Sequence, residues 1–344
     1  MKSTCRRTIM PNSLLPILGT ILAVGMSAAA LAADKEPPKG EVKIDVGGFK
    51  LNSLLLPPKK NADLPPIVFI HGASTSLYDP LYAFREPLEG RATLLFVDRP
   101  GHGLSDIGPK ENVLPDAQAD AIARLMEKRG IPKAIIVGHS FGGAITAAFA
   151  LRHSDMVEGL IFLSPALYPW PGGISWYYDA ARAPVAGIFF STLIAPPAGL
   201  FALNTAVKGV FAPNPMPSDY VSKTKAYRAL RPAAFRHNAQ EVGGLNAWAK
   251  IASARYKDIK APTIIIAGDK DNVVSTEIHS KHLARDIPGA ELIIAHNLGH
   301  KSDFVARDLV VAAVEKIAGK KRNLKALAKT LEMKIAGDSV VKAK

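Results

Sequence analysis

The sequence predicts an α/β fold in which a mainly parallel sheet is flanked by helices and carries a helical cap insertion. Short apolar runs rich in β-branched residues and leucine alternate along the chain with helical stretches. These runs lack polar alternation, which is typical of strands buried on both faces, and strands joined through helices form parallel sheets. One long interval in the middle of the chain has no strand pattern at all. It is where we expect the insertion.

The elements are expected in a definite order. Residues 42–46 and 49–56 alternate around a Gly-Gly pair and predict an antiparallel hairpin. The buried strands are expected at residues 67–70, 93–97, 134–137, 159–163, 263–267 and 291–295. Helices are expected at residues 116–129, 141–151, 276–286 and 302–317. From about residue 165 to 248 prolines and aromatic residues accumulate, which predicts a cap over the strand ends, where open α/β sheets bind ligands.

Composition narrows the class of protein further. The chain has 344 residues, of which 48% are hydrophobic and 21% charged. These values argue against wholesale disorder and against a polytopic membrane protein. The single cysteine, Cys5, excludes an intramolecular disulfide and a cysteine-based zinc site. The formal net charge of +13 is the unusual feature, because it suggests nucleic acid, an anionic membrane surface or charged tails.

Residues 1–33 have the features of a secretory signal peptide. A basic start without acidic residues precedes an uncharged apolar stretch at 13–30, and small residues crowd positions 28–33. This order predicts export, with cleavage near residues 30–33. An uncleaved N-terminal anchor is the alternative, because about 18 apolar residues can span a bilayer. We therefore expect an exported bacterial protein that is periplasmic, or anchored in the inner membrane and facing the periplasm.

The C-terminal residues 319–344 form a basic tail, with eight Lys or Arg and two acidic residues. Its apolar residues recur at helical spacing: Leu324, Leu327, Leu331 and Ile335. This pattern predicts a helix that is either a solvated extension or a segment lying on an anionic membrane surface. Removing +3 for residues 1–33 and +6 for this tail leaves +4 for the rest of the chain. Nucleic acid binding is therefore not expected.

The strongest chemical signal lies at residues 138–142, which have the sequence Gly-His-Ser-Phe-Gly. They follow the predicted strand 134–137 and open the predicted helix 141–151, as a nucleophile elbow requires. Glycines two positions before and after Ser140 remove Cβ atoms where the sharp turn crowds the backbone, and the helix N-terminus favours developing negative charge. The alternative is an incidental serine in a glycine-rich turn. The context favours a nucleophile.

On these residues the chain resembles the α/β-hydrolase family over roughly residues 41–318. Residues 71–74, His-Gly-Ala-Ser, follow a strand and look like the family's oxyanion loop. The resemblance implies that the backbone N–H groups of Ala73 and Phe141 hold the oxyanion. It also implies that His71 orders its own loop, and that His102 in the loop after the next strand braces that loop rather than acting as a base.

The same resemblance supplies the rest of a catalytic triad. Residues 268–274 look like the family's acid turn, in which we assign Asp271 to orient the histidine and treat Asp269 as a turn residue. His300 follows the last predicted strand, where the family keeps its catalytic histidine, and the alternatives are His296 and His279. The residues after His300 are Lys-Ser-Asp, whereas the family often has an aromatic or apolar residue there. This departure bears on the polarity of the pocket.

The order Ser140, Asp271, His300 is the one that this fold uses. It implies a serine hydrolase that cleaves a carboxylic ester through an acyl-enzyme, with no metal or organic cofactor. A C–C bond hydrolase of a β-diketone-type substrate is one alternative, and a non-catalytic binding protein on the same scaffold is another. A serine at the elbow argues against haloalkane dehalogenases and epoxide hydrolases, which use aspartate there.

The expected cap contains an uncharged stretch between Arg182 and Lys208. A membrane-spanning helix is not expected here, because Pro196-Pro197 and Gly199 should break it. The stretch is instead expected to form amphipathic cap helices, or an apolar lid that admits a lipophilic ester. The expected partner is a small-molecule ester. Contact with a membrane surface is expected, if anywhere, through the N- or C-terminal segment.

Overall fold

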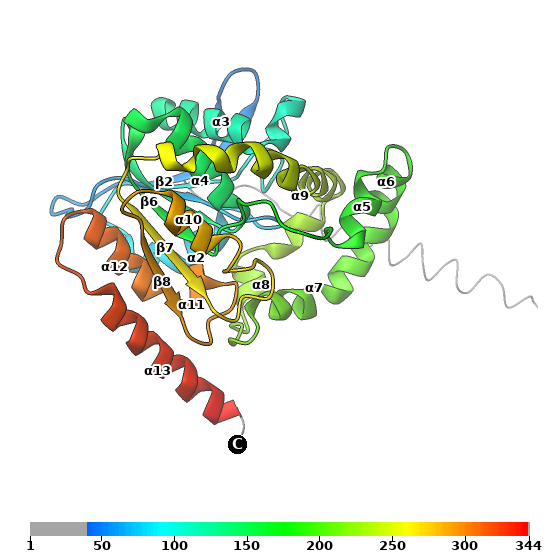
Figure 1. The fold of residues 1–344 in the computed structure, drawn as a ribbon. Coiled ribbons are helices and arrows are strands. Elements are labelled where there is room, and N and C mark those ends of the chain that lie inside the picture. The colour runs from blue at the N-terminus through cyan, green and yellow to red at the C-terminus, as the bar shows by residue number, and fades with distance from the viewer. Residues whose placement is uncertain (1–39, 343–344) are drawn as a thin grey trace, which may run out of the picture.

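An eight-stranded, mostly parallel sheet forms the centre of the molecule and confirms the predicted fold class (Figure 1). The computed structural model describes residues 40–342, so the signal peptide or anchor predicted at 1–33 lies outside the described residues. The strands lie in the order β1-β2-β4-β3-β5-β6-β7-β8, and all pairs beyond β4 are parallel. Their bounds are β1 Glu41–Asp45, β2 Lys50–Leu56, β3 Ile67–Ile70, β4 Leu94–Val97, β5 Ala134–His139, β6 Val157–Leu163, β7 Thr263–Gly268 and β8 Glu291–Ala295.

The predicted hairpin is present, since β1 and β2 pair in antiparallel register. Every residue of β3, β4, β5 and β7 is buried, because helices cover both faces of the sheet. One face is covered by α3 Pro115–Lys128, α4 Phe141–Arg152 and α10 Ser280–Asp286. The other face is covered by α2 Tyr78–Leu88 and α12 Arg307–Ile317. The absence of polar alternation in the strands therefore reflects two apolar layers.

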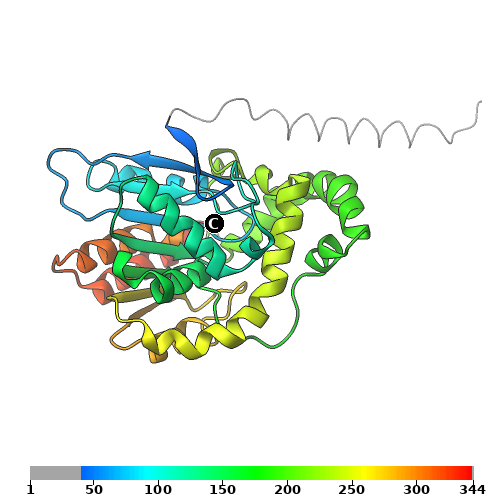
Figure 2. The same cartoon turned by 90° about the horizontal axis from the view of Figure 1, so that it is seen from above.

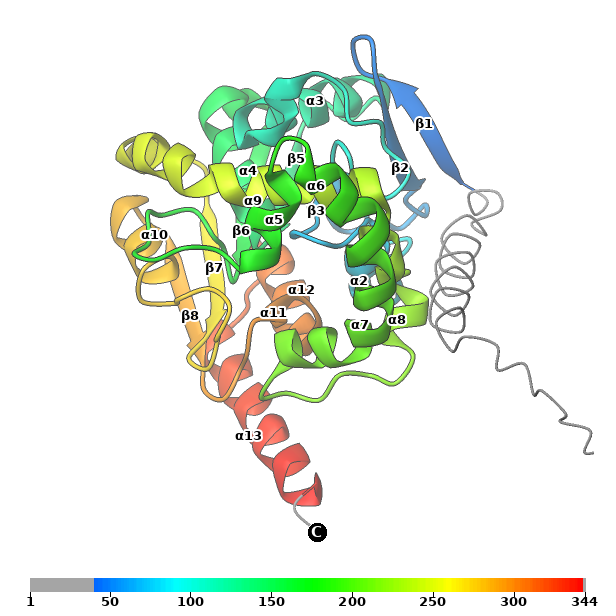
Figure 3. The same cartoon turned by 90° about the vertical axis from the view of Figure 1, so that its right-hand side faces the viewer.

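Helices alone lie between β6 and β7, and they stand in front of the sheet in Figure 3. We call residues 165–248 the cap. It contains α5 Trp176–Arg182, α6 Ala186–Phe189, a π-helical turn at Phe190–Ile194, α7 Ala195–Phe211, α8 Tyr220–Lys223, a 3-10 turn at Ala226–Leu230 and most of α9 Pro232–Ala252. Figure 2 shows α9 running along the domain while α5 to α7 project beyond it.

The sequence predicted that the prolines at 196 and 197 would break the helix here. The structure shows no such break. The prolines fall in the first turn of α7, directly after the wider π-helical turn, so helical structure continues over residues 186–211. Prolines and π-helical turns both mark irregularities within otherwise continuous helices. By length and composition this is the one helix among residues 40–342 that could cross a membrane, and about a fifth of it (22%) is buried.

The C-terminal segment forms the predicted helix, α13 Leu324–Lys342, but it is not simply a solvated extension. Leu324, Ala328 and Ile335 are buried in the core beside β8 and α12, while Leu327 is exposed. Part of its apolar side therefore packs on the domain. The hydrophobic core accordingly extends past residue 318. The helix predicted at 302–317 is also divided, into α11 Ser302–Val305 and α12, because Ala306 leaves the helical conformation (φ −96°, ψ 24°).

Candidate active site

Ser140 occupies a strained turn between β5 and α4. Its backbone has φ 54° and ψ −119°, a conformation that non-glycine residues rarely adopt and that marks functional sites. A Cβ atom at Gly138 would lie 2.2 Å from Thr146 Oγ1, and one at Gly142 would lie 2.3 Å from the Ile70 carbonyl oxygen. Both glycines are therefore required by close backbone approach. The elbow geometry agrees with what the motif predicted.

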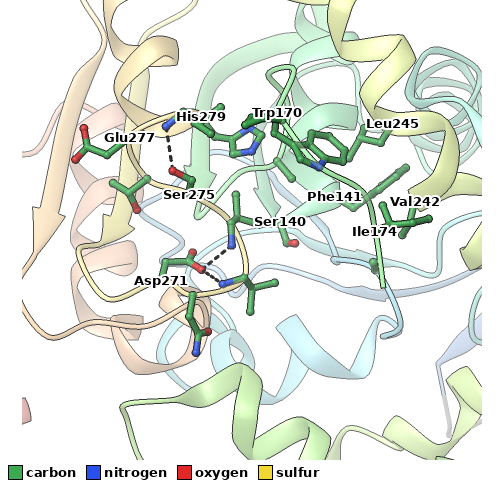
Figure 4. A pocket seen from close by; sticks show the side chains of 18 of the residues that line it. Ser140, Phe141, Trp170, Ile174, Val242, Leu245, Asp271, Ser275, Glu277 and His279 are labelled. Atoms are coloured by element: carbon green, nitrogen blue, oxygen red, sulfur yellow. Dashed lines mark hydrogen bonds between the residues drawn. The ribbon is translucent and has the colours of Figure 1, made fainter. Parts of the chain in front are cut away.

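A cavity of about 720 Å³ lies beside this turn, under the cap. Ser140 lies between two unlike walls of it (Figure 4). The apolar wall consists of Phe141, Trp170, Ile174, Val242 and Leu245. The other wall, formed by residues 271–279, carries the polar residues Asp271, Ser275, Glu277 and His279 interspersed with Val273, Val274 and Ile278, and we call it the polar wall. A ligand held here would place an apolar part against the cap and a polar part toward the acid turn.

The two predicted oxyanion residues, Ala73 and Phe141, line the same cavity as Ser140. Within residues 40–342 neither backbone N–H forms a hydrogen bond to another protein group. Unpaired amides at a buried position are rare in native proteins, so they point to an acceptor supplied from outside. Phe141 also begins α4, where the helix dipole adds positive potential. The two amides are suited to hold a developing negative charge.

Asp271 and His300 form a buried pair. The distance between His300 Nδ1 and Asp271 Oδ2 is 2.8 Å, and the other carboxylate oxygen accepts the amides of Val273 and Val274 at 2.9 and 2.8 Å. Burial alone would raise the pKa of Asp271, but the hydrogen bond and charge of His300 and the two amides lower it below its ordinary value. An ionised Asp271 holds the proton of His300 on Nδ1 and leaves Nε2 free to act as a base.

His300 lies next to the elbow. His139, which precedes Ser140, has its ring 4.8 Å from the His300 ring, and its Nε2 donates to the His300 carbonyl oxygen at 2.9 Å. Burial lowers the pKa of His139 well below its ordinary value, so it is neutral. In the described part of the chain the Ser140 hydroxyl makes no hydrogen bond to His300. Such bonds are often long in free enzymes and tighten when substrate binds.

The alternative histidines have other partners. His296 Nδ1 lies 2.6 Å from Asp269 Oδ2, so residues 269 and 296 form another Asp–His pair near the first. The His296 side chain is 63% exposed, however, whereas that of His300 is 4% exposed. His279 faces the cavity, and its Nδ1 accepts the amides of Leu167 and Tyr168. Burial lowers the pKa of His279 to about 4. Only His300 combines burial, an aspartate partner and contact with the elbow.

His71 and His102 brace loops, as predicted. His71 Nε2 accepts the amide of Arg99 at 3.1 Å, and His102 Nε2 lies 2.7 Å from Glu241 Oε2 on cap helix α9. The Arg99 guanidinium donates to Glu241 and to the Gly72 carbonyl, and it lies 4.7 Å from the centre of the Phe141 ring. Arg99 and Glu241 therefore connect the oxyanion loop to the cap. The sequence did not predict this buried pair.

A buried cluster of charged residues is centred on Lys301, the residue that follows His300. Lys301 Nζ donates to both oxygens of Asp79, at 2.9 and 2.8 Å, and to Asp303 at 2.9 Å. Lys301 does not line the cavity, so the expected effect of the Lys-Ser-Asp sequence on pocket polarity is wrong. Asp79, His139 and Asp303 have ligand atoms close enough to share a metal ion. The Lys301 ammonium already contacts both carboxylates and offsets one of their two negative charges, which weakens the attraction for a second cation.

A cap residue that the sequence did not single out holds the loop of His300. Asn214 donates its side-chain N–H to the Asn297 carbonyl at 2.9 Å and accepts the Gly299 amide at 2.8 Å. A Cβ atom at Gly299 would lie 2.3 Å from the Ala212 carbonyl oxygen, so this position also requires glycine. The cap thus fixes the backbone on the N-terminal side of His300. A lone Asn between prolines gives no signal of this in the sequence.

Comparisons with known proteins agree with the fold of this chain. A family model described as alpha/beta hydrolase fold matches residues 65–304. The chain is 26% identical over 280 residues to 2-(acetamidomethylene)succinate hydrolase of Mesorhizobium japonicum, covering 79% of this chain and 92% of that protein. It is 28% identical over 259 residues to pimeloyl-acyl-carrier-protein methyl ester esterase of Chromobacterium violaceum, covering 70% and 91%. The enol-lactonase of Burkholderia xenovorans LB400 shares the fold, with a TM-score of 0.65, 20% identity, and 81% and 100% of the two chains covered.

Proposed function

Because the chain belongs to the alpha/beta hydrolase family, whose members similar to it are hydrolytic enzymes, we propose that it is a serine hydrolase that cleaves a carboxylic ester with an apolar acyl group. One observation carries the proposal. The strained Ser140 faces a cavity that also contains two unpaired amides, and the buried Asp271–His300 pair lies beside it. Nucleophile, base, orienting acid and oxyanion donors are the parts that acyl transfer requires.

The reaction would proceed in two steps. In the first, His300 Nε2 takes the proton of the Ser140 hydroxyl while the serine oxygen attacks the ester carbonyl. Asp271 keeps the Nδ1 proton in place and stabilises the imidazolium. The amides of Ala73 and Phe141 bind the oxyanion, and the loss of one such donor costs about 3–4 kcal/mol in an enzyme where it has been measured. The imidazolium then gives its proton to the leaving alcohol.

In the second step water hydrolyses the acyl-enzyme, with His300 again as the base. The acyl chain would lie against the apolar wall of the cavity, formed by Trp170, Ile174, Val242 and Leu245. The leaving alcohol would lie toward the polar wall. Each buried methylene stabilises the bound acyl group by about 0.8 kcal/mol, close to fourfold in affinity. This supports a longer acyl group over acetyl.

The proposal predicts the outcome of a substrate panel. With p-nitrophenyl esters of increasing acyl length, kcat/KM should rise at least about tenfold from acetyl to octanoyl. A fluorophosphonate probe should label the wild-type protein and not Ser140→Ala. A preference for acetyl would contradict the apolar acyl group, and equal labelling of both proteins would contradict the nucleophile. A kcat/KM for a β-diketone above that of every ester would favour the C–C hydrolase instead.

We also propose that the protein is exported, on the strength of the sequence of residues 1–33. Mass spectrometry of the protein isolated from its bacterial host should find a mature N-terminus near Ala33 or Asp34. Recovery of the intact N-terminal methionine on membrane-bound protein would contradict cleavage and favour the anchor. The measurement needs no assumption about the reaction.

A further inference from the structure

The cap carries an unusual concentration of exposed apolar side chains. Eight of the fifteen large hydrophobic residues that are exposed among residues 40–342 lie within positions 176–201. We call them the cap patch, which consists of Trp176, Tyr177, Val185, Ile188, Phe189, Leu193, Ile194 and Phe201. Trp176 is 72% exposed and Phe201 is 95% exposed. Exposed large apolar side chains concentrated in one segment in this way are typical of an interaction site.

The helical segment from 185 to 195 has small residues on its buried side and large apolar residues on its exposed side. This is the reverse of what is expected for a helix that packs on a domain. Small residues at four-residue spacing, Gly187, Ser191 and Ala195, are buried on its inner side. The outer side carries Ile188 and Leu193 in solvent. The turn before this segment is fixed to α9 through Arg236, which donates to the carbonyl oxygens at 181, 183 and 184. The outward position of the patch is therefore held by hydrogen bonds and close packing.

The patch adjoins the mouth of the cavity. Ser175 and Tyr178 line the cavity, and the two residues between them, Trp176 and Tyr177, belong to the patch. The Trp176 ring contacts Phe190 at 6.0 Å between ring centres, which joins α5 to the turn that follows α6. Tryptophan and tyrosine favour the interface between lipid headgroups and acyl chains. A lipid that leaves a bilayer at this surface would meet the cavity within one helical turn.

The charge of the cap distinguishes between the partners that an apolar surface could bind. The cap contains seven Lys or Arg and three acidic residues. One of each sign is buried, Arg228 and Glu241, which leaves six basic and two acidic residues at least partly exposed. No charged residue occurs between Arg182 and Lys208. A second copy docking symmetrically through this basic cap would be repelled, whereas anionic headgroups would attract it. We propose that the cap patch docks on the surface of an anionic lipid bilayer, with Trp176 at the level of the headgroups.

Tryptophan fluorescence tests this directly in the full chain. The three tryptophans are Trp170, Trp176 and Trp248, so neither terminal segment contains one. Trp170 lines the cavity, and Trp248 is buried with its indole N–H donating to Asp116. Vesicles of phosphatidylglycerol mixed with a phosphatidylcholine brominated in its acyl chains should quench the emission of the wild type. Trp176→Phe should lose this quenching while still binding the vesicles.

Substitutions on and off the patch complete the test. Phe189→Asp should lower the vesicle partition coefficient about tenfold or more and leave hydrolysis of a soluble ester unchanged, because Phe189 does not line the cavity. The matched control is Ile251→Asp, since Ile251 is exposed on α9 outside the patch, and its partition should not change. If the wild-type protein bound vesicles without quenching of its Trp176 emission, the membrane contact would be assigned to a terminal segment and the proposal would be overturned. A dimer in light scattering, together with no quenching, would also overturn it.

The docking proposal and the proposed function can fail separately. The quenching experiment is repeated with Ser140→Ala, which removes hydrolysis but should still dock. Hydrolysis is measured on esters free in solution, which need no bilayer. If the protein does not dock on vesicles but retains esterase activity, only the docking proposal is overturned.

Discussion

Replacing His300 by alanine should lower kcat for ester hydrolysis by about 10⁴- to 10⁶-fold. Removal of the base of a serine triad has this effect elsewhere, because the remaining oxyanion donors and binding contacts supply only a small part of the rate. KM should change little, since His300 does not line the cavity that would hold the acyl chain. Stopped assays over hours, with active-site titration of the wild type, are sensitive enough to measure the residual rate.

The Asp269–His296 pair provides a matched control for this substitution. His296 and Asp269 lie on the same side of the sheet, four and two residues before His300 and Asp271, and they pair at a similar distance. His296→Ala should change kcat by no more than a few-fold, because its ring faces solvent. If His296→Ala were the more severe of the two, the assignment of the base would be reversed.

The proximity of Ser140, Asp271 and His300 was predictable because each lies in a local motif after the carboxyl end of a strand. A run of apolar residues indicated each of β5, β7 and β8, and the residues after each run then fell at one edge of a parallel sheet. Ser140 and His300 could be predicted without any information about the cap. The strand pattern was informative for the same reason, since burial on both faces leaves a sequence signal that does not depend on distant residues.

The predicted start of one helix was wrong because side chains form hydrogen bonds with the backbone there. The helix predicted to start at residue 276 starts at Ser280. The Thr276 hydroxyl instead donates to the Gly268 carbonyl, and Ser275 Oγ accepts the amide of Ile278. Such bonds compete with helix formation at its first turn. One partner is the last residue of β7 and the other lies three residues along the same segment, and hydrophobic periodicity detects neither bond.

The supports of the site were not predictable, because they join distant segments. Asn214 reaches a loop more than eighty residues away, and Arg99 meets Glu241 across 142 residues. The burial of Lys301 was not predicted either, since lysine is rarely buried. Its burial depends on Asp79 from α2, which no pattern in the sequence connects to it. Each of these contacts exists only once the cap and sheet are assembled.

The buried Lys301 should be the most costly of these supports to remove. Burial alone would lower the pKa of Lys301, but the charges of Asp303 and Asp79 raise it well above its ordinary value, so it is charged. The Tyr220 hydroxyl donates to Asp79, and the ammonium lies 5.4 Å from the Tyr220 ring centre. Lys301→Met should lower the free energy of unfolding by about 3–5 kcal/mol at pH 8, because it leaves two buried carboxylates without a cation.

The pH dependence of this loss distinguishes lost charge from lost packing. In Lys301→Met the folded state would bind a proton between Asp79 and Asp303 more tightly than the unfolded chain does. When the folded state binds more protons, stability falls as pH rises, so urea unfolding should show a larger loss at pH 8 than at pH 5. Adding Asp303→Asn to Lys301→Met should recover part of the loss at pH 8. Lys133→Met is the control, because Lys133 pairs with Glu158 at the surface and should cost less than about 1 kcal/mol. A loss that is equal at both pH values would mean that Lys301 contributes through packing alone.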